Sequence, residues 1–310
     1  MKHLEKLSKY GVLIVLGFLV AFFSMNTDAF LTSSNLINVV RQVSITGICA
    51  VGMTFVIITG GIDLSVGSII AVASVSAAYF MKLGISPIIA TAIALLLGII
   101  IGLINALMIN EFKLSPLIST MGSMTILRGV AYVITGGLPI HGFSENYRFL
   151  GQGYIGAIPV PVIIMLLVFL VGYIILSKTT FGRYVYGVGG NEEATVLSGI
   201  SVKKVKYMSY AMSGLMAALA GVVLLSRINS GQASAGLGYE LDVVTAVVLG
   251  GISVNGGEGK ITGVLAGIFI MGILTNGMIL MGINEYYQSI AKGLVLIGAV
   301  AFDTLIKHKK

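Results

Sequence analysis

Charged residues are scarce in this sequence: they make up 10% of its 310 residues, whereas hydrophobic residues make up 56%. Soluble domains carry about 25% charged residues, and a chain with so few cannot cover its surface in water. The apolar residues stand in continuous runs, which is typical of membrane helices and not of a membrane β-barrel. The composition therefore predicts an all-α, polytopic membrane protein. It excludes a cytosolic enzyme, a secreted disulfide-linked protein and a disordered chain.

Cysteine, histidine and tryptophan are also rare or missing. The single cysteine, Cys49, excludes an intrachain disulfide. The three histidines, at positions 3, 141 and 308, have no metal-ligand spacing. With no tryptophan, any aromatic belt at the membrane surfaces must come from the 13 tyrosines and 13 phenylalanines. The sequence therefore predicts neither a metal site nor catalytic residues.

The sequence lacks a Walker A phosphate loop. Gly259-Lys260 is followed by Ile261, and Val254 stands where the first glycine of that motif belongs. Residues 151–156 do match Gly-x-Gly-x-x-Gly, but they follow no strand and open no dinucleotide-binding unit. In a chain with 41 glycines such a match is expected by chance. We therefore predict that this chain binds no cofactor.

The apolar runs predict about ten transmembrane helices, because about 20 residues at 1.5 Å per residue cross the ~30 Å hydrocarbon core. The predicted spans are 10–25, 36–58, 63–81, 87–109, 117–135, 159–177, 207–226, 241–252, 261–281 and 287–303. The runs 117–135, 241–252 and 287–303 are the weaker candidates. The first span resembles a signal peptide, but residues 24–28 are not a small-x-small cleavage site, so we interpret it as an uncleaved helix.

Basic residues predict the orientation. With the N-terminus inside, 13 of the 19 lysines and arginines lie in cytoplasmic segments and 3 in outer segments, as the positive-inside rule requires. Both termini are therefore expected in the cytoplasm. Two connections are long, the outer loop 136–158 and the inner loop 178–206, and the whole chain 1–310 is expected to form one transmembrane domain.

Small residues recur at helical spacing in Gly98-xxx-Gly102, Gly263-xxx-Gly267 and Ser213-xxx-Ala217-xxx-Gly221. Such stripes let membrane helices approach closely, and we favour packing within the chain over a dimer seam. No strong internal repeat is present. Two inner turns, 57–68 and 247–259, are weakly alike in their glycines.

The 12 acidic residues fall at span ends or in loops, which argues against a proton relay or an ion-driven transporter. Asp63 and Ser65 begin a span, either as a helix N-cap or as a turn at the inner mouth. Glu240 and Asp242 precede another span. These two acids either cap that helix or face an outer partner.

The inner loop contains a predicted short helix outside the membrane. Asn191 can cap it, and Glu192 and Glu193 in its first turn suit the positive end of the helix dipole. Gly199 can end it. The alternative for this pattern is a solvated surface helix without a partner.

Glu193-Ala194-Thr195-xxx-Gly199 resembles the EAA-xxx-G loop of ABC importer permeases, with Thr195 in place of the second alanine. Longer strings resemble the ribose-type monosaccharide permeases, and they cover nearly the whole chain: residues 52–68, 182–200, 238–259 and 286–300.

This resemblance implies a multi-pass subunit of the bacterial inner membrane that imports a sugar. It implies a cytoplasmic ATP-binding partner that uses ATP and Mg, a periplasmic or lipid-anchored sugar-binding protein and a second permease copy. The residues implied in coupling to the ATPase are Asn191, Glu192, Glu193, Ala194, Ser198 and Gly199. The resemblance also raises a role for Asp63 and Ser65 at the inner mouth.

The competing hypothesis is an ATP-independent secondary transporter or facilitator, which would not need the short inner helix. In either case a neutral sugar calls for hydroxyl and amide partners. The polar span residues that serve as pathway candidates are Gln42, Asn105, Arg128, Asn276 and Gln288. Each can equally bond a neighbouring helix. Three basic residues within spans, Arg41, Arg128 and Lys292, fall in the outer half, where each either reaches the interface or points into the bundle.

Overall fold

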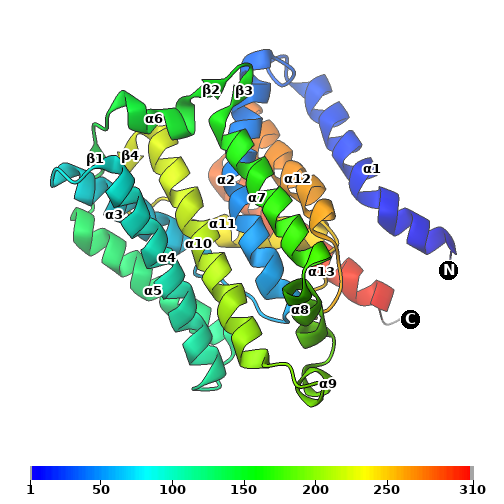
Figure 1. The fold of residues 1–310 in the computed structure, drawn as a ribbon. Coiled ribbons are helices and arrows are strands. Elements are labelled where there is room, and N and C mark those ends of the chain that lie inside the picture. Colours follow the sequence, from blue (N-terminus) through cyan, green and yellow to red (C-terminus); the bar gives the residue numbers. More distant parts are fainter. Residues whose placement is uncertain (1, 308–310) are drawn as a thin grey trace.

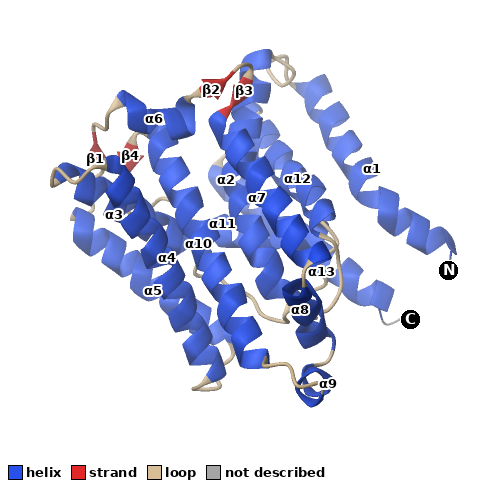
Figure 2. Ribbon diagram, in the orientation of Figure 1, coloured by secondary structure: helices blue, strands red, loops and turns tan. Residues whose placement is uncertain are grey.

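The computed structural model describes residues 2–307, and this part of the chain is a bundle of thirteen α-helices with four two-residue strands (Figures 1 and 2). The helices are α1 (Lys2–Asn26), α2 (Ser33–Ile58), α3 (Val66–Lys82), α4 (Pro87–Asn110), α5 (Pro116–Thr135), α6 (Glu145–Gln152), α7 (Val160–Lys178), α8 (Thr180–Gly190), α9 (Glu192–Leu197), α10 (Val202–Ile228), α11 (Tyr239–Leu249), α12 (Ile261–Leu280) and α13 (Glu285–Lys307). The strands are β1 (Ile140–His141), β2 (Tyr154–Ile155), β3 (Ile158–Pro159) and β4 (Ser230–Gly231). His308, Lys309 and Lys310, which belong to the predicted cytoplasmic C-terminus, lie outside the described residues.

Each predicted span corresponds to one helix, and most boundaries agree closely. Six helices within residues 2–307 are long and apolar enough to cross a membrane: α2, α4, α5, α7, α10 and α12. Two shorter apolar helices are α3 and the segment Gly11–Asn26 of α1. The all-α membrane fold predicted from composition is therefore confirmed.

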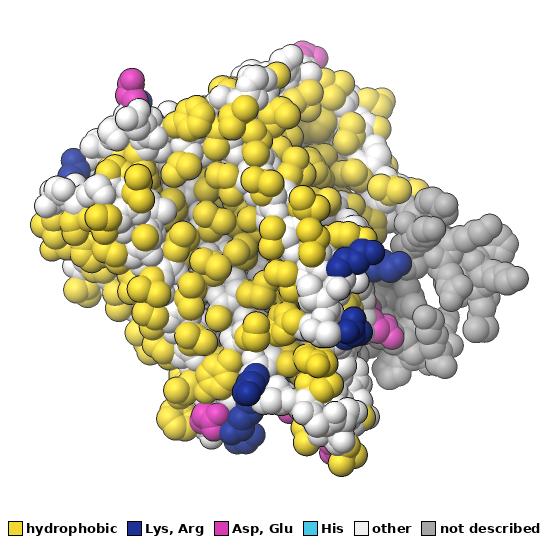
Figure 3. All heavy atoms as spheres, in the orientation of Figure 1, with side chains coloured by type: hydrophobic (Ala, Val, Ile, Leu, Met, Phe, Trp, Pro, Cys, Tyr) yellow, Lys and Arg dark blue, Asp and Glu magenta, His cyan; other side chains and the backbone are white. Residues whose placement is uncertain are grey.

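The core of the bundle forms around α2 and α10. In their most apolar stretches 83% of α2 and 67% of α10 is buried, compared with 22% of α4 and α5. Helix α10 packs against α4, α2 and α3, and α2 also contacts α7, α12 and α11. Since α4, α5 and α7 expose apolar side chains outward, the outer helices present a surface suited to lipid. Figure 3 shows this hydrophobic face, with many of its charged side chains toward the end that carries α8 and α9.

Small residues bring the helices into direct backbone contact. A methyl group on Gly98 would overlap the carbonyl oxygen of Gly214, and one on Gly102 would overlap that of Tyr210. Helix α12 approaches α11 in the same way at Gly267. The predicted use of these stripes for packing within the chain is therefore confirmed.

Helix α11 departs from the predicted span 241–252. It has 11 residues, which is about 16 Å of helix and too short to cross the hydrocarbon core. The non-helical segment 229–238 precedes it: β4 pairs with β1 of the outer loop, and Gly236 lies against Gly67 at the start of α3. This part of the bundle is therefore built from a two-residue strand and a series of turns, followed by a short helix.

We predict that Gly102→Ala lowers the melting temperature in detergent, because the added methyl meets only backbone atoms of Tyr210 and Ala211. Overpacking of this kind costs about 1–3 kcal/mol. The matched control is Gly129→Ala on the exposed face of α5, where a methyl meets no other described atom within 4 Å. This control should keep or slightly raise the melting temperature, since alanine favours helix. Equal melting temperatures for both variants would contradict the packing described here.

Candidate functional site

The inner loop forms two short helices, of which the sequence predicted one. Thr179 caps α8 by accepting a hydrogen bond from the Gly182 amide at 3.2 Å. The predicted cap of α9 is confirmed, because the Asn191 side chain accepts from the Ala194 amide at 2.9 Å. The predicted end is confirmed as well: Gly199 has a φ of 78° and donates its amide to Val196. Asn191 alone separates α8 from α9, and its extended backbone makes a corner between the two helices (Figure 1).

Helix α9 lies at the tip of the molecule and is mostly exposed (Figure 1). Of its residues only Thr195 is buried, and it donates its hydroxyl to the Asn191 carbonyl at 2.7 Å. Leu197 is 89% exposed and Val196 is 56% exposed. Glu192, Glu193, Ala194, Ser198 and Gly199 are all exposed as well. This helix therefore offers a mixed apolar and acidic surface.

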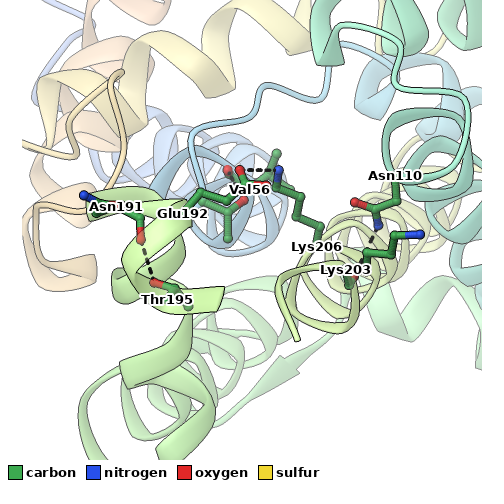
Figure 4. A network of polar contacts seen from close by, with 8 residues as sticks. Val56, Asn110, Asn191, Glu192, Thr195, Lys203 and Lys206 are labelled. Atoms are coloured by element: carbon green, nitrogen blue, oxygen red, sulfur yellow. Dashed lines mark hydrogen bonds and ion pairs between the residues drawn. The ribbon is translucent and has the colours of Figure 1, made fainter. Parts of the chain in front are cut away.

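Polar contacts join α9 and the end of α4 to the start of α10, and Figure 4 shows the Lys206–Glu192 ion pair and the Asn110–Lys203 hydrogen bond among them. Lys206 binds Glu192 at 2.7 Å, and Lys203 binds Glu111 at 2.6 Å. The amide of Asn110 donates to the Lys203 carbonyl at 3.2 Å. The hydrogen bond from Lys203 also lowers the pKa of Glu111 below its ordinary value. The start of α10 is thereby tied both to α9 and to the end of α4.

The turn 59–65 between α2 and α3 contains a fully buried carboxylate. Asp63 accepts hydrogen bonds from the Ser65 amide at 3.1 Å, the Ser65 hydroxyl at 2.5 Å and the Ser213 hydroxyl at 2.7 Å. The Asn105 amide donates to the Ser65 hydroxyl at 2.9 Å, and Ser123 donates to the Asn105 carbonyl oxygen at 2.5 Å. This cluster, hereafter the Asp63 network, ties the turn to α4, α5 and α10.

The Asp63 network bears on the predicted helix N-cap role of Asp63 and Ser65. Ser65 precedes α3 but its side chain does not cap the helix, so a simple N-cap role is wrong for it. Asp63 does stand at a helix boundary, as predicted, yet it is completely buried rather than facing water. A buried charge needs several donors to offset its lost hydration, and the two serines provide them.

The other polar span residues lie apart from this network. Asn276 and Asn35 exchange amide hydrogen bonds at 2.8 and 2.9 Å, which joins α12 to α2. Gln288 donates to the Ile283 carbonyl at 2.8 Å, just before the start of its own helix. Gln42 is partly buried on α2. Of the five pathway candidates, the structure brings only Asn105 together with Asp63 and Ser65.

Arg128 points into the bundle from α5. Its guanidinium donates to the carbonyl oxygens of Ala233 at 2.6 Å and Ala235 at 2.8 Å. Both alanines belong to the non-helical segment 229–238 and are buried. Arg128 therefore satisfies backbone groups that no helix or sheet pairs.

The two other basic span residues also bind protein groups. Arg41 donates to the Gln152 carbonyl at 2.8 Å and stacks over the Tyr154 ring at 4.7 Å. Lys292 of α13 pairs with Asp242 at 2.7 Å, with both side chains mostly buried. Asp242, one of the two acids expected to cap α11 or face an outer partner, therefore binds a lysine inside the bundle. The other acid, Glu240, lies beside Gly67 of α3.

The sequence did not single out Ser123, Ser213, Lys206 or Leu197 as site residues. Ser213 was visible as the first member of a small-residue stripe, but nothing in one sequence shows which polar residue such a stripe faces. In the sequence Lys206 indicates only the orientation of the chain, as one of the basic residues of the inner loop. The exposure of Leu197 follows from the corner between α8 and α9, which the sequence did not reveal.

Comparison with known proteins identifies a family that the chain matches. Residues 35–300 match the family described as branched-chain amino acid transport system / permease component. The chain is 46% identical to the ribose import permease protein RbsC of Bacillus subtilis (strain 168) over 96% of this chain and 93% of that protein. It is 45% identical to the RbsC protein of Escherichia coli (strain K12), over 94% and 92% of the two chains. It is 40% identical to the L-arabinose transport system permease protein AraH of the same strain, over 95% and 90%. No solved structure matches the chain.

We predict that Arg128→Leu destabilises the protein, because it leaves the buried carbonyls of Ala233 and Ala235 without a donor. An unsatisfied buried polar group costs about 1–3 kcal/mol. The melting temperature in detergent should fall, and proteolysis within 229–238 should accelerate. The control is Arg148→Leu on α6, whose ion-pair partner Glu145 is 91% exposed and which should change stability little. An unchanged melting temperature for Arg128→Leu would show that these hydrogen bonds contribute nothing.

Proposed function

This chain belongs to the permease-component family of ABC importers, and on that premise we propose that it forms the translocation pathway for ribose or a related monosaccharide. The observation that carries the proposal is the likeness to ribose permeases over nearly the full length of both chains. The lower identity to an arabinose permease supports a monosaccharide as the substrate class and ribose as the first sugar to test.

The proposal includes partners that supply what the chain lacks. Its sequence contains no Walker A loop, so a separate cytoplasmic subunit would bind ATP and Mg. A periplasmic or lipid-anchored protein would deliver the sugar at the outer face. A second copy of the permease would complete the pathway.

Helix α9 is the proposed contact with the ATP-binding subunit. Its exposed apolar residues, Val196 and Leu197, lie beside exposed acids and away from the apolar flanks of the bundle. An apolar patch rimmed by polar groups is typical of a protein interface. The proposed coupling residues are Asn191, Glu192, Glu193, Ala194, Ser198 and Gly199.

The inner turn is the proposed gate of the pathway. Asp63 and Ser65 lie on it, and Asn105 is bonded to Ser65, which supports all three as one unit. Gln42, Arg128, Asn276 and Gln288 remain proposals for the pathway. Arg128, Asn276 and Gln288 already bind protein groups, so a sugar would have to displace those bonds to use them.

We further propose that ten helices make up a single transmembrane domain over 1–310, with both termini in the cytoplasm of a bacterium. The helices are α1–α5, α7 and α10–α13, with α11 crossing only in part. The basic residues Lys203, Lys204 and Lys206 at the start of α10 then face the cytoplasm, in agreement with the positive-inside rule.

We predict ATP-dependent uptake of labelled ribose in proteoliposomes that contain this chain, its ATP-binding subunit and its sugar-binding protein. Glu193→Lys should abolish most uptake and detach the ATP-binding subunit, since it reverses a charge on the proposed contact. Glu193→Gln is the matched control and should retain binding. Uptake without ATP would favour a facilitator, and normal uptake by the lysine variant would remove Glu193 from the interface.

We predict the topology with single cysteines in a Cys49→Ala background. A cysteine at position 145 should react with an impermeant maleimide from outside the cell. A cysteine at position 197 should react only after the membrane is opened. The permease is expressed without its ATP-binding subunit, which would otherwise cover α9. Both positions are then highly exposed, at 91% for the Glu145 side chain and 89% for Leu197, so a failure to react reports the side of the membrane. The reverse pattern would overturn the orientation.

A further inference from the structure

Three segments meet at one backbone oxygen, the carbonyl of Ile58 at the end of α2. The Gly257 amide donates a hydrogen bond to it at 2.8 Å. Gly189, near the end of α8, lies so close that a methyl group there would overlap the same oxygen. The end of α2, the end of α8 and the loop after α11 therefore share a single contact point, hereafter the Ile58 joint.

Glycines make this joint possible. Gly256 has a φ of 84° and lies against Gly60, and Gly257 has a φ of 72° and lies against Gly190. Both positions need the left-handed backbone that glycine adopts freely. The two glycine-rich turns 57–68 and 247–259, alike in sequence, thus pack against each other.

A side-chain bond reinforces the joint from α8. The Tyr186 hydroxyl donates to the Gly259 carbonyl at 2.8 Å, which fixes α8 to the same loop two residues beyond Gly257. This hydrogen bond holds the relative position of the two segments without adding bulk between them.

The joint continues into the bundle through the inner turn. Gly61 lies against the Tyr210 ring of α10, and two residues later Asp63 binds Ser213 of the same helix. The Ser65–Asn105–Ser123 bonds extend the connection to α4 and α5. An unbroken series of contacts therefore leads from the corner before α9 to the Asp63 network.

Contacts between backbones have no rotamer freedom to absorb a displacement. Close-packed interiors transmit movement because there is no space into which atoms can yield. A shift of α8 that follows α9 must therefore either carry Ile58 and the inner turn with it or separate the joint.

We propose that Gly189 and Tyr186 are positioning residues for transport: through the Ile58 joint they pass the movement of α9 to the inner turn. The inference rests on the proposed function, in which α9 binds the ATP-binding subunit. It goes further by assigning the route from that contact to the gate, through residues that touch neither ATP nor sugar.

The test compares Gly189→Ala with Gly190→Ala in the reconstituted complex. Both glycines end α8, but a methyl on Gly190 meets no other described atom within 4 Å. The measured quantity is ribose taken up per ATP hydrolysed, together with the amount of assembled complex. Gly189→Ala should lower this ratio about tenfold while the complex still assembles and hydrolyses ATP, and Gly190→Ala should stay within about twofold of the unaltered protein.

Tyr186→Phe provides a second measurement that adds no bulk. Losing the hydrogen bond to Gly259 should lower the same ratio by about two- to fivefold. If Gly189→Ala fails to assemble, this variant decides the question. An unchanged ratio in Tyr186→Phe, or a Gly189→Ala variant that only loses yield while each assembled complex transports normally, would overturn the proposal. Failure of the unaltered complex to take up ribose would instead refute the proposed function.

Discussion

The structure depends on one constraint: within an apolar bundle every backbone polar group must find its partner inside the protein. The helices satisfy this requirement along their own length. The non-helical stretches cannot, and each has a specific solution. Arg128 donates hydrogen bonds to carbonyls of the segment 229–238. Asp63 accepts one from the Ser65 amide, and the Gly257 amide donates one to the Ile58 carbonyl at the end of α2. The polar residues of greatest interest are therefore found where helices are interrupted.

Close approach of helices is the second condition for these solutions. The bonds between Asp63 and Ser213 and between Asn105 and Ser65 need α4, α10 and the inner turn to lie within hydrogen-bond reach of one another. Gly98 and Gly102 allow this, because α4 touches the backbone of α10 at both positions. Since lipid offers no hydrophobic drive for helix association, packing of small residues and buried polar bonds stabilise the bundle together.

Much of the helical framework could be predicted because long apolar runs have few alternatives in a membrane. Asn191 and Gly199 likewise marked the ends of α9 by local chemistry alone. What the sequence could not reveal depends on distant partners. The burial of Asp63 results from residues up to 150 positions away, and the short α11 follows a non-helical segment whose carbonyls are satisfied by Arg128. Helix α8 was missed because its glycines are poor helix formers, and tertiary contact at Gly189 overrides that preference.

The bond between Arg128 and Ala233 joins residues 105 positions apart, and this separation has a consequence for biogenesis. During synthesis α5 leaves the ribosome long before the segment that will accept its guanidinium. Until then a charged side chain stands on a helix with no partner, and its aliphatic stem can carry it only toward the membrane surface. The contact of α5 with the segment 229–238 therefore cannot form until α6 to α10 have been made. Residues 229–238 supply both carbonyls, so a non-helical segment gives α5 its final polar contacts before α11, α12 and α13 complete the bundle.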